Sequence, residues 1–253
     1  MISQFLANYE LTVIGFLIAF LATLLLGIAK AGIKGLGILI VTLMVFVFGG
    51  KASTGVLMPL MLLADVFAVI YYHRHTQWIY LRKLLPMMFL GVLIGVFYGG
   101  EFSESIFKNV MAVLILLSIT IMIYMDKKYT QVPQNKFFGL SIGLLAGFTS
   151  MVGNLAGSLV TVYFLAMRLP KKEFIGTAAW LFFCINLFKL PFHVFAWGTI
   201  HVDSLRTDLL LMPGIFLGFL IGISVVKLFS NQGYRKFIFA VTAIGALIIL
   251  IDN

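Results

Sequence analysis

The protein has 253 residues, of which 62% are hydrophobic and 11% are charged, whereas about a quarter of the residues in a soluble domain are charged. A core of this size cannot bury so much apolar surface, so the composition indicates a membrane protein and argues against nucleic-acid modules and disulfide scaffolds. The formal charge of +9 comes from 18 Lys and Arg against 9 Asp and Glu. In a membrane protein, this excess predicts basic cytoplasmic loops.

Apolar runs of about 17 to 25 residues are candidates for membrane-spanning helices. Such runs occupy residues 11–29, 53–72, 84–100, 106–124, 174–197, 208–226 and 236–251. Two further stretches, 31–50 and 137–167, are interrupted by glycines. As a helix, residues 137–167 would measure about 46 Å, which is too long for one crossing and too short for two. We therefore expect a hairpin that enters and leaves on the same face.

Basic residues gather in four predicted loops, which together hold twelve of the 18 Lys and Arg residues: 73–83, 126–136, 168–173 and 227–236. Cytoplasmic loops are enriched in Lys and Arg, so we predict that these four loops face the cytoplasm. The intervening turns, predicted on the opposite face, carry Glu101, Glu104, Asp203 and Asp208. The stretch 137–167 has a basic loop on either side, as a returning hairpin requires.

The sequence also contains a collinear internal repeat. The segment 86–95 recurs 127 residues later as 213–222, and other pairs recur at shifts of 120 or 121, namely Gly27 and Gly147, Gly37 and Gly157, Gly55 and Gly176, and Asp65 and Asn186. The charge pattern places residues 72–83 inside and their counterparts 197–206 outside, so the repeats are predicted to be inverted. Inverted repeats with interrupted helices are typical of transporters, with the binding site at the repeat interface.

These patterns predict an all-α, polytopic membrane fold with two inverted-topology repeats of about five helical segments each. The first repeat covers 1–125, a basic cytoplasmic linker covers 126–136, and the second repeat covers 137–253; together they form a single transmembrane domain. Each repeat is expected to open with a Gly-rich broken or re-entrant helix hairpin.

The tips of the two hairpins carry the first candidate site residues. Non-helical backbone at membrane depth needs partners from protein or from a water-filled cavity, and helix N-termini directed into a cavity favour an anion. We predict that Lys30, Lys34, Ser150 and Asn154 bind substrate, and that the tip glycines permit gating: Gly35, Gly37, Gly153 and Gly157. The alternative for Lys30 and Lys34 is that they end a helix at the membrane surface.

Other polar residues lie within the predicted spans. Asp65 is expected to be either a protonatable coupling group or the partner of a buried lysine, because an isolated carboxylate in lipid is costly. Asn186 and Lys189 are predicted to face the substrate, with snorkelling to the outer face as the alternative for Lys189. Thr54 and Thr177 are further candidate ligands, although such threonines often bond only to the preceding helical turn.

Catalytic and metal-binding patterns are lacking in the sequence. The four histidines do not have zinc-site spacing, and we find neither a G-x-S-x-G nor an H-E-x-x-H motif. We therefore expect no enzyme activity, no metal and no cofactor.

The glycine motifs resemble those of a known family. The segments 27–37 and 146–157, together with Pro170-Lys-Lys-Glu-Phe-Ile-Gly-Thr177-Ala, are similar to the repeated signature of the sulfite exporter TauE/SafE family, and the likeness spans nearly the whole chain. It implies a bacterial inner-membrane secondary transporter of sulfur oxyanions or organosulfonates, such as sulfite or sulfoacetate. The second tip departs from the family's usual Gly-x-Gly-Gly run, with Gly153-Asn154-Leu-Ala-Gly157 in its place.

The functional prediction is a secondary active transporter of sulfur-containing anions that works by alternating access, coupled to an ion gradient. A passive anion channel and an integral membrane enzyme are the alternatives. The expected partners are a small anionic substrate and membrane lipid, without nucleic acid, and assembly as a homodimer is left open.

Overall fold

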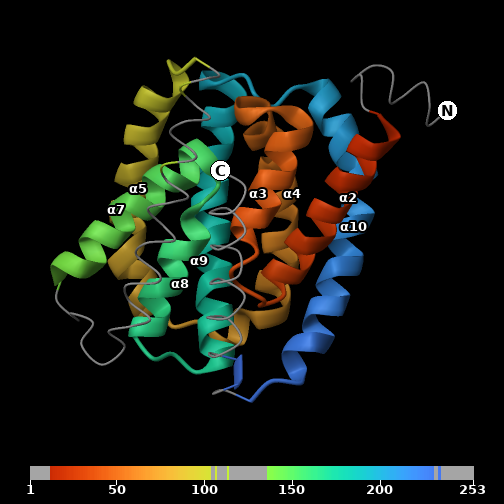
Figure 1. Ribbon diagram of the computed structural model, residues 1–253. Coiled ribbons are helices and arrows are strands. Elements are labelled where there is room, and N and C mark those ends of the chain that lie inside the picture. Colours follow the sequence, from red (N-terminus) through yellow and green to blue (C-terminus); the bar gives the residue numbers. More distant parts are fainter. Residues whose placement is uncertain (1–11, 104–105, 107–112, 114–135, 231–232, 235–253) are drawn as a thin grey trace.

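The computed structural model describes residues 12–103, 106, 113, 136–230 and 233–234. This part of the chain contains helices joined by short connections, and no strand (Figure 1). In chain order its elements are α2 (Val13–Lys30), α3 (Gly37–Phe48), α4 (Gly50–Tyr72), η1 (His73–His75), α5 (Trp78–Gly100), α7 (Lys136–Gly153), α8 (Ala156–Ala166), α9 (Lys171–Pro191), the π-helix η2 (Phe192–Ala196) and α10 (Val202–Lys227). The predicted spans 106–124 and 236–251 and most of the predicted linker lie outside the described residues.

Five of these helices are long and apolar enough to cross a membrane, with mean hydropathies from 1.5 to 2.5. They are α2, α4 with η1, α5, α9 with η2, and α10. Each coincides with a predicted span, so the protein is an all-helical, multi-pass membrane protein.

Two helical hairpins combine a long helix with a short one. The 18-residue α2 is followed by the 12-residue α3, and the 18-residue α7 by the 11-residue α8. The turn between α7 and α8 places Asn154 at φ 56°, a left-handed conformation that Asn adopts more readily than most residues. The backbone N–H groups of Asn154 and Leu155 donate to the carbonyls of Ser150 and Thr149, which ends α7 in a compact turn.

Several predicted boundaries were wrong. Arg82 and Lys83, expected in a loop, lie inside α5, and Asp203 and Asp208, expected in an outer turn, lie inside α10. Leu, Arg and Lys are good helix formers, and Asp203 lies in the first turn of α10, where an acid is favoured by the helix dipole. Charged residues at the end of an apolar span can therefore extend the helix instead of breaking it. The hydropathy of a segment therefore locates its lipid-facing part, whereas the helix itself continues beyond it.

Three of the four predicted basic loops meet at one end of the molecule (Figure 1), and the fourth lies almost wholly outside the described residues. The backbone N–H of Gln77 donates to Thr177 Oγ1 over 2.9 Å, and the Lys171 ammonium donates to the carbonyls of Val226 and Phe229. At the opposite end, the indole N–H of Trp197 donates to the carbonyl of Val96 over 3.2 Å. The loops after α4, before α9 and after α10 thus share one face, as their charge predicted.

Glycines allow two pairs of helices to pack with their backbones in contact. A Cβ atom at Gly218 of α10 would lie 2.0 Å from the carbonyl oxygen of Leu24 in α2. A Cβ atom at Gly147 of α7 would lie 2.0 Å from the carbonyl oxygen of Met88 in α5. Side chains cannot be accommodated at such positions, so the glycines hold α2 against α10 and α5 against α7.

Replacing one of these glycines should destabilise the protein. We expect Gly218→Ala to cost about 1–3 kcal/mol, because the added methyl group must push α2 away from α10. Gly139→Ala is the matched control, since a Cβ there would lie 3.5 Å from Tyr163, an ordinary contact distance. Thermal unfolding in detergent should show a lower melting temperature for Gly218→Ala alone. Equal melting temperatures for the two variants would contradict the close packing.

Candidate functional site

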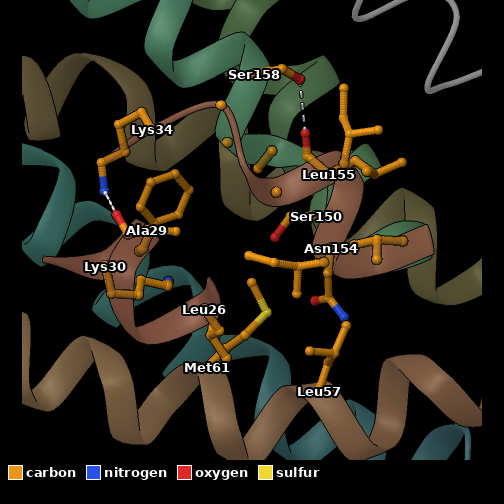
Figure 2. A pocket seen from close by; sticks show the side chains of 18 of the residues that line it. Leu26, Ala29, Lys30, Lys34, Leu57, Met61, Ser150, Asn154, Leu155 and Ser158 are labelled. Carbon is orange, nitrogen blue, oxygen red and sulfur yellow. Dashed lines mark hydrogen bonds between the residues drawn. The ribbon is translucent and has the colours of Figure 1, made fainter. Parts of the chain in front are cut away.

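A cavity of about 70 Å³ lies where the two hairpin tips approach each other (Figure 2). Its volume suits a few water molecules or one compact anion. Leu26, Leu57, Met61 and Phe182 form apolar parts of its wall. Its polar lining comes from both halves of the chain: Lys30, Lys34, Ser150, Asn154, Ser158 and Asn186. The structure therefore brings together residues that are more than a hundred positions apart in the sequence.

Lys30 is neutralised by a buried carboxylate. Its ammonium lies 2.6 Å from Asp65 Oδ1, and the other carboxylate oxygen accepts a hydrogen bond of 2.6 Å from the Asn186 side-chain amide. Asp65 and Asn186 are 0% and 2% exposed. Of the two alternatives for Asp65, partner of a buried lysine is the arrangement present in this conformation. Lys30 also lies 4.8 Å from the centre of the Phe182 ring.

Lys34 also lines the cavity, but it forms no ion pair with a carboxylate of the described chain. Its ammonium donates to the carbonyl oxygen of Ala29 over 3.3 Å and lies 5.6 Å from the centre of the Phe182 ring. The residue is only 7% exposed. A buried ammonium with one neutral acceptor retains unused donor capacity, so Lys34 can bind an anion that enters the cavity.

Lys189 anchors the second tip from within the protein. Its ammonium donates to the backbone carbonyl of Ser150 over 2.8 Å, to Ser150 Oγ over 3.1 Å and to Asn154 Oδ1 over 2.8 Å. Lys189 is 0% exposed, so it does not snorkel to the surface, and it lies behind the cavity wall. Three oxygen acceptors occupy all three of its donors. Lys189 therefore reaches the cavity through Ser150 and Asn154.

The short helices α3 and α8 both begin at the cavity. Their first residues, Gly37 and Ala156, line it, and neither N-terminus receives a side-chain cap from the described residues. A Cβ atom on Gly37 or on Gly157 would meet no atom within 4 Å. The missing side chains thus leave open space beside two uncapped helix N-termini, whose free N–H groups and partial positive charge favour an anion.

The first tip has backbone partners that the sequence did not reveal. The hydroxyl of Tyr72 donates to the carbonyl of Ala31 over 2.7 Å, and the hydroxyl of Tyr234 donates to the carbonyl of Gly32. These tyrosines and Phe182 belong to a chain that is 15% aromatic. No motif distinguishes them from lipid-facing aromatic residues, so only the fold identifies them.

The remaining predicted residues differ in position. Gly35 lines the cavity with φ 98°, a conformation that favours glycine, and Gly153 ends α7 behind the tip. Thr54 and Thr177 lie outside the cavity lining. The Thr54 hydroxyl donates to the carbonyl of Lys51, whereas Thr177 accepts from Gln77 at the basic end. The geometry therefore gives these two threonines contacts within and between helices.

In a comparison with protein families, residues 13–249 match a family model described as Sulfite exporter TauE/SafE. Comparisons with curated proteins and with solved structures give no match.

Loss of the Asp65 carboxylate should destabilise the buried cluster. We expect Asp65→Asn to cost about 3–5 kcal/mol, because it leaves the Lys30 ammonium buried without an opposite charge. The double variant Lys30→Met with Asp65→Leu removes both charges and should recover much of the loss. Melting temperatures of the purified proteins measure both effects. If the double variant is less stable than Asp65→Asn alone, the ion pair does not explain the stability of this cluster.

Proposed function

The chain belongs to the sulfite exporter TauE/SafE family of membrane transporters, and from this premise we propose that it moves sulfur-containing anions by alternating access. The substrates in this proposal are sulfite, sulfoacetate or other organosulfonates. We place the protein in a bacterial inner membrane with its basic loops in the cytoplasm. Coupling to an ion gradient is part of the proposal.

The observation that carries the proposal is the set of positive groups around the cavity. Lys34 lines it without a carboxylate partner among the described residues, and the uncapped N-termini of α3 and α8 begin there. Sulfite and sulfonate groups are compact and present three acceptor oxygens. Such a group can accept from the Lys34 ammonium and from helix N–H groups. The side-chain amide of Asn154 borders the same cavity, where it accepts from Lys189 and donates to the carbonyl of Thr54.

The charge balance of the cluster is also consistent with an anionic substrate. Lys30, Lys34 and Lys189 are buried, and Asp65 is the carboxylate that pairs with one of them. A substrate with two negative charges, such as sulfoacetate, needs a second cation besides Lys34. In our proposal Lys30, which lines the same cavity, supplies the second charge only when its ion pair with Asp65 opens.

Helix contacts support the inverted repeat. Residues 55 and 176 are repeat mates, as are 65 and 186. In space, Gly55 lies against Thr199, Asp65 bonds to Asn186, and Gly176 lies against Tyr72, so α4 and α9 run antiparallel. Two antiparallel helices that are repeat mates, and that touch at a pair of matched residues, can be related by a two-fold axis that is perpendicular to both helices and passes through this pair. We place this axis between Asp65 and Asn186.

The glycine contacts support the same relation. Leu24 lies against Gly218, and Leu144 lies against Gly91. Leu144 follows Leu24 by 120 positions, and Gly218 follows Gly91 by 127. The packing of α2 on α10 thus repeats in the packing of α7 on α5. In our proposal, the two related units move relative to each other and expose the cavity to each side in turn.

Transport can be tested in liposomes that contain the purified protein. We expect labelled sulfite outside the vesicles to exchange rapidly for unlabelled sulfite inside, since a carrier reorients with bound substrate. Lys34→Gln should weaken the apparent affinity about 10- to 100-fold, because it removes a charge-assisted contact. Lys227→Gln, at the exposed end of α10, is the matched control.

The result separates the proposal from its alternatives. A passive channel would be favoured if sulfite only flowed down its concentration gradient and labelled sulfite did not enter in exchange for unlabelled sulfite. Unchanged exchange kinetics in Lys34→Gln would place the anion elsewhere. Conversion of sulfite to another compound by the purified protein would revive the enzyme alternative.

Filling the cavity should block transport without harming the fold. We expect Gly157→Val to abolish exchange, because its side chain would enter the open space beside the N-terminus of α8. The melting temperature should stay near the wild-type value, since a Cβ atom at position 157 would meet no atom within 4 Å. Exchange at the wild-type rate in a folded Gly157→Val protein would show that the anion does not occupy this space.

A further inference from the structure

A second buried carboxylate, Asp208, lies outside the anion cavity. It is 1% exposed, and neither carboxylate oxygen has a hydrogen-bond partner in the described chain. Asp65, another buried carboxylate of the described chain, has partners on both of its oxygens. Buried polar groups are nearly always paired, so an unpaired acid within a membrane helix calls for an explanation.

Asp208 lies on the face of α10 that packs against α2. Leu211 and Ile215, three and seven residues further along α10, belong to one buried cluster with Ala19 and Ala22 of α2. Residues at these spacings share one side of a helix. Gly218 continues the same stripe and touches Leu24. The carboxyl group is therefore placed at a tight interface between helices of the two halves.

Among the described residues, the elements packed against α10 supply no opposite charge to this acid. On α2 the charged residue is Lys30, whose ammonium is paired with Asp65, and it lies about 16 Å along the helix from Ala19. On α4 the titratable groups are Lys51, Asp65, Tyr71 and Tyr72, and the Lys51 ammonium donates to the carbonyl of Gly100. None of these groups hydrogen-bonds to Asp208.

On α10 and its N-cap, the titratable groups nearest to Asp208 in sequence are His201, Asp203 and Arg206. Asp203 and Arg206 form an exposed ion pair of 2.9 Å, Lys227 ends the helix, and His201 caps its beginning. Ionised Asp208 would be a buried charge without an opposite charge bonded to it among the described residues, whereas the protonated acid is neutral. The packed interface therefore holds the acid with its proton, and release of the proton requires water to enter between α2 and α10.

We propose that Asp208 is the proton-binding site that couples the anion cycle to a pH gradient, an inference that rests on the transport function proposed above. In the packed conformation a proton occupies one carboxylate oxygen. When the interface opens, the proton passes to water on the side then exposed, and the carboxylate remains hydrated until it is protonated again. Because α2 carries Lys30 and the first tip at its other end, opening this interface also displaces one wall of the cavity.

The test uses liposomes with a pH difference across the membrane and the electrical potential clamped at zero. Wild-type protein should accumulate labelled sulfite above the level in protein-free vesicles, which accounts for leakage through the lipid. Asp208→Asn should lose this accumulation and retain sulfite exchange at equal pH, because its neutral amide resembles the protonated acid. Asp203→Asn, an exposed acid on the same helix, is the matched control and should accumulate like the wild type.

The assignment of Asp208 as the proton site would be overturned if Asp208→Asn accumulated labelled sulfite to the wild-type level. It would also be overturned if accumulation by the wild type did not depend on the pH difference. Absence of exchange in the wild type would contradict the transport function instead, so the two failures are distinguishable. Asp208→Ser is a second replacement that cannot titrate, with melting temperature as the check on folding. It should also lose accumulation while retaining exchange.

Discussion

Non-helical backbone inside a membrane must find hydrogen-bond partners within the protein, and both hairpin tips are built around this requirement. At the first tip, the hydroxyls of Tyr72 and Tyr234 bond to the carbonyls of Ala31 and Gly32. At the second tip, one ammonium, that of Lys189, bonds to three oxygens of Ser150 and Asn154. The tips can therefore end two helices at depth and open the space between them.

Because the two tips are supported by different groups, the two sides of the cavity differ in charge. Neutral hydroxyls support the first tip, so its lysines remain beside the cavity, with Lys30 balanced by Asp65 and Lys34 bonded to a carbonyl. At the second tip, Lys189 bonds to the tip itself, so this tip borders the cavity with Ser150, with Asn154 and with the uncapped N-terminus of α8. An anion between the tips meets charge on one side and neutral donors on the other.

Much of this arrangement was predictable, because hydropathy, charge and glycine spacing depend only on the order of residues in the sequence. The five described spans, the hairpin at 137–167 and the pairing of a buried lysine with Asp65 follow from rules about the cost of polar groups in lipid. What could not be predicted depends on which helix faces which. From the sequence, Asp208 is expected in a turn, and only the structure shows it buried on the side of α10 that packs against α2. Likewise, nothing in the sequence distinguishes Tyr72 from other aromatic residues, and only the structure shows its hydroxyl bonded to the first tip.

The packing of α2 on α10 and of α5 on α7 has a consequence for biogenesis. During synthesis the first half leaves the ribosome and enters the membrane while the helices that cover its glycine faces are still untranslated. For that interval, the backbone at Gly91 and the groove of α2 that receives Gly218 are exposed to lipid or to the insertion machinery. In the described part of the chain, α2 and α5 complete their close helix contacts only with helices of the other half. The order of insertion and the order of folding must therefore differ, and the packing of α2 is completed only after α10 has arrived.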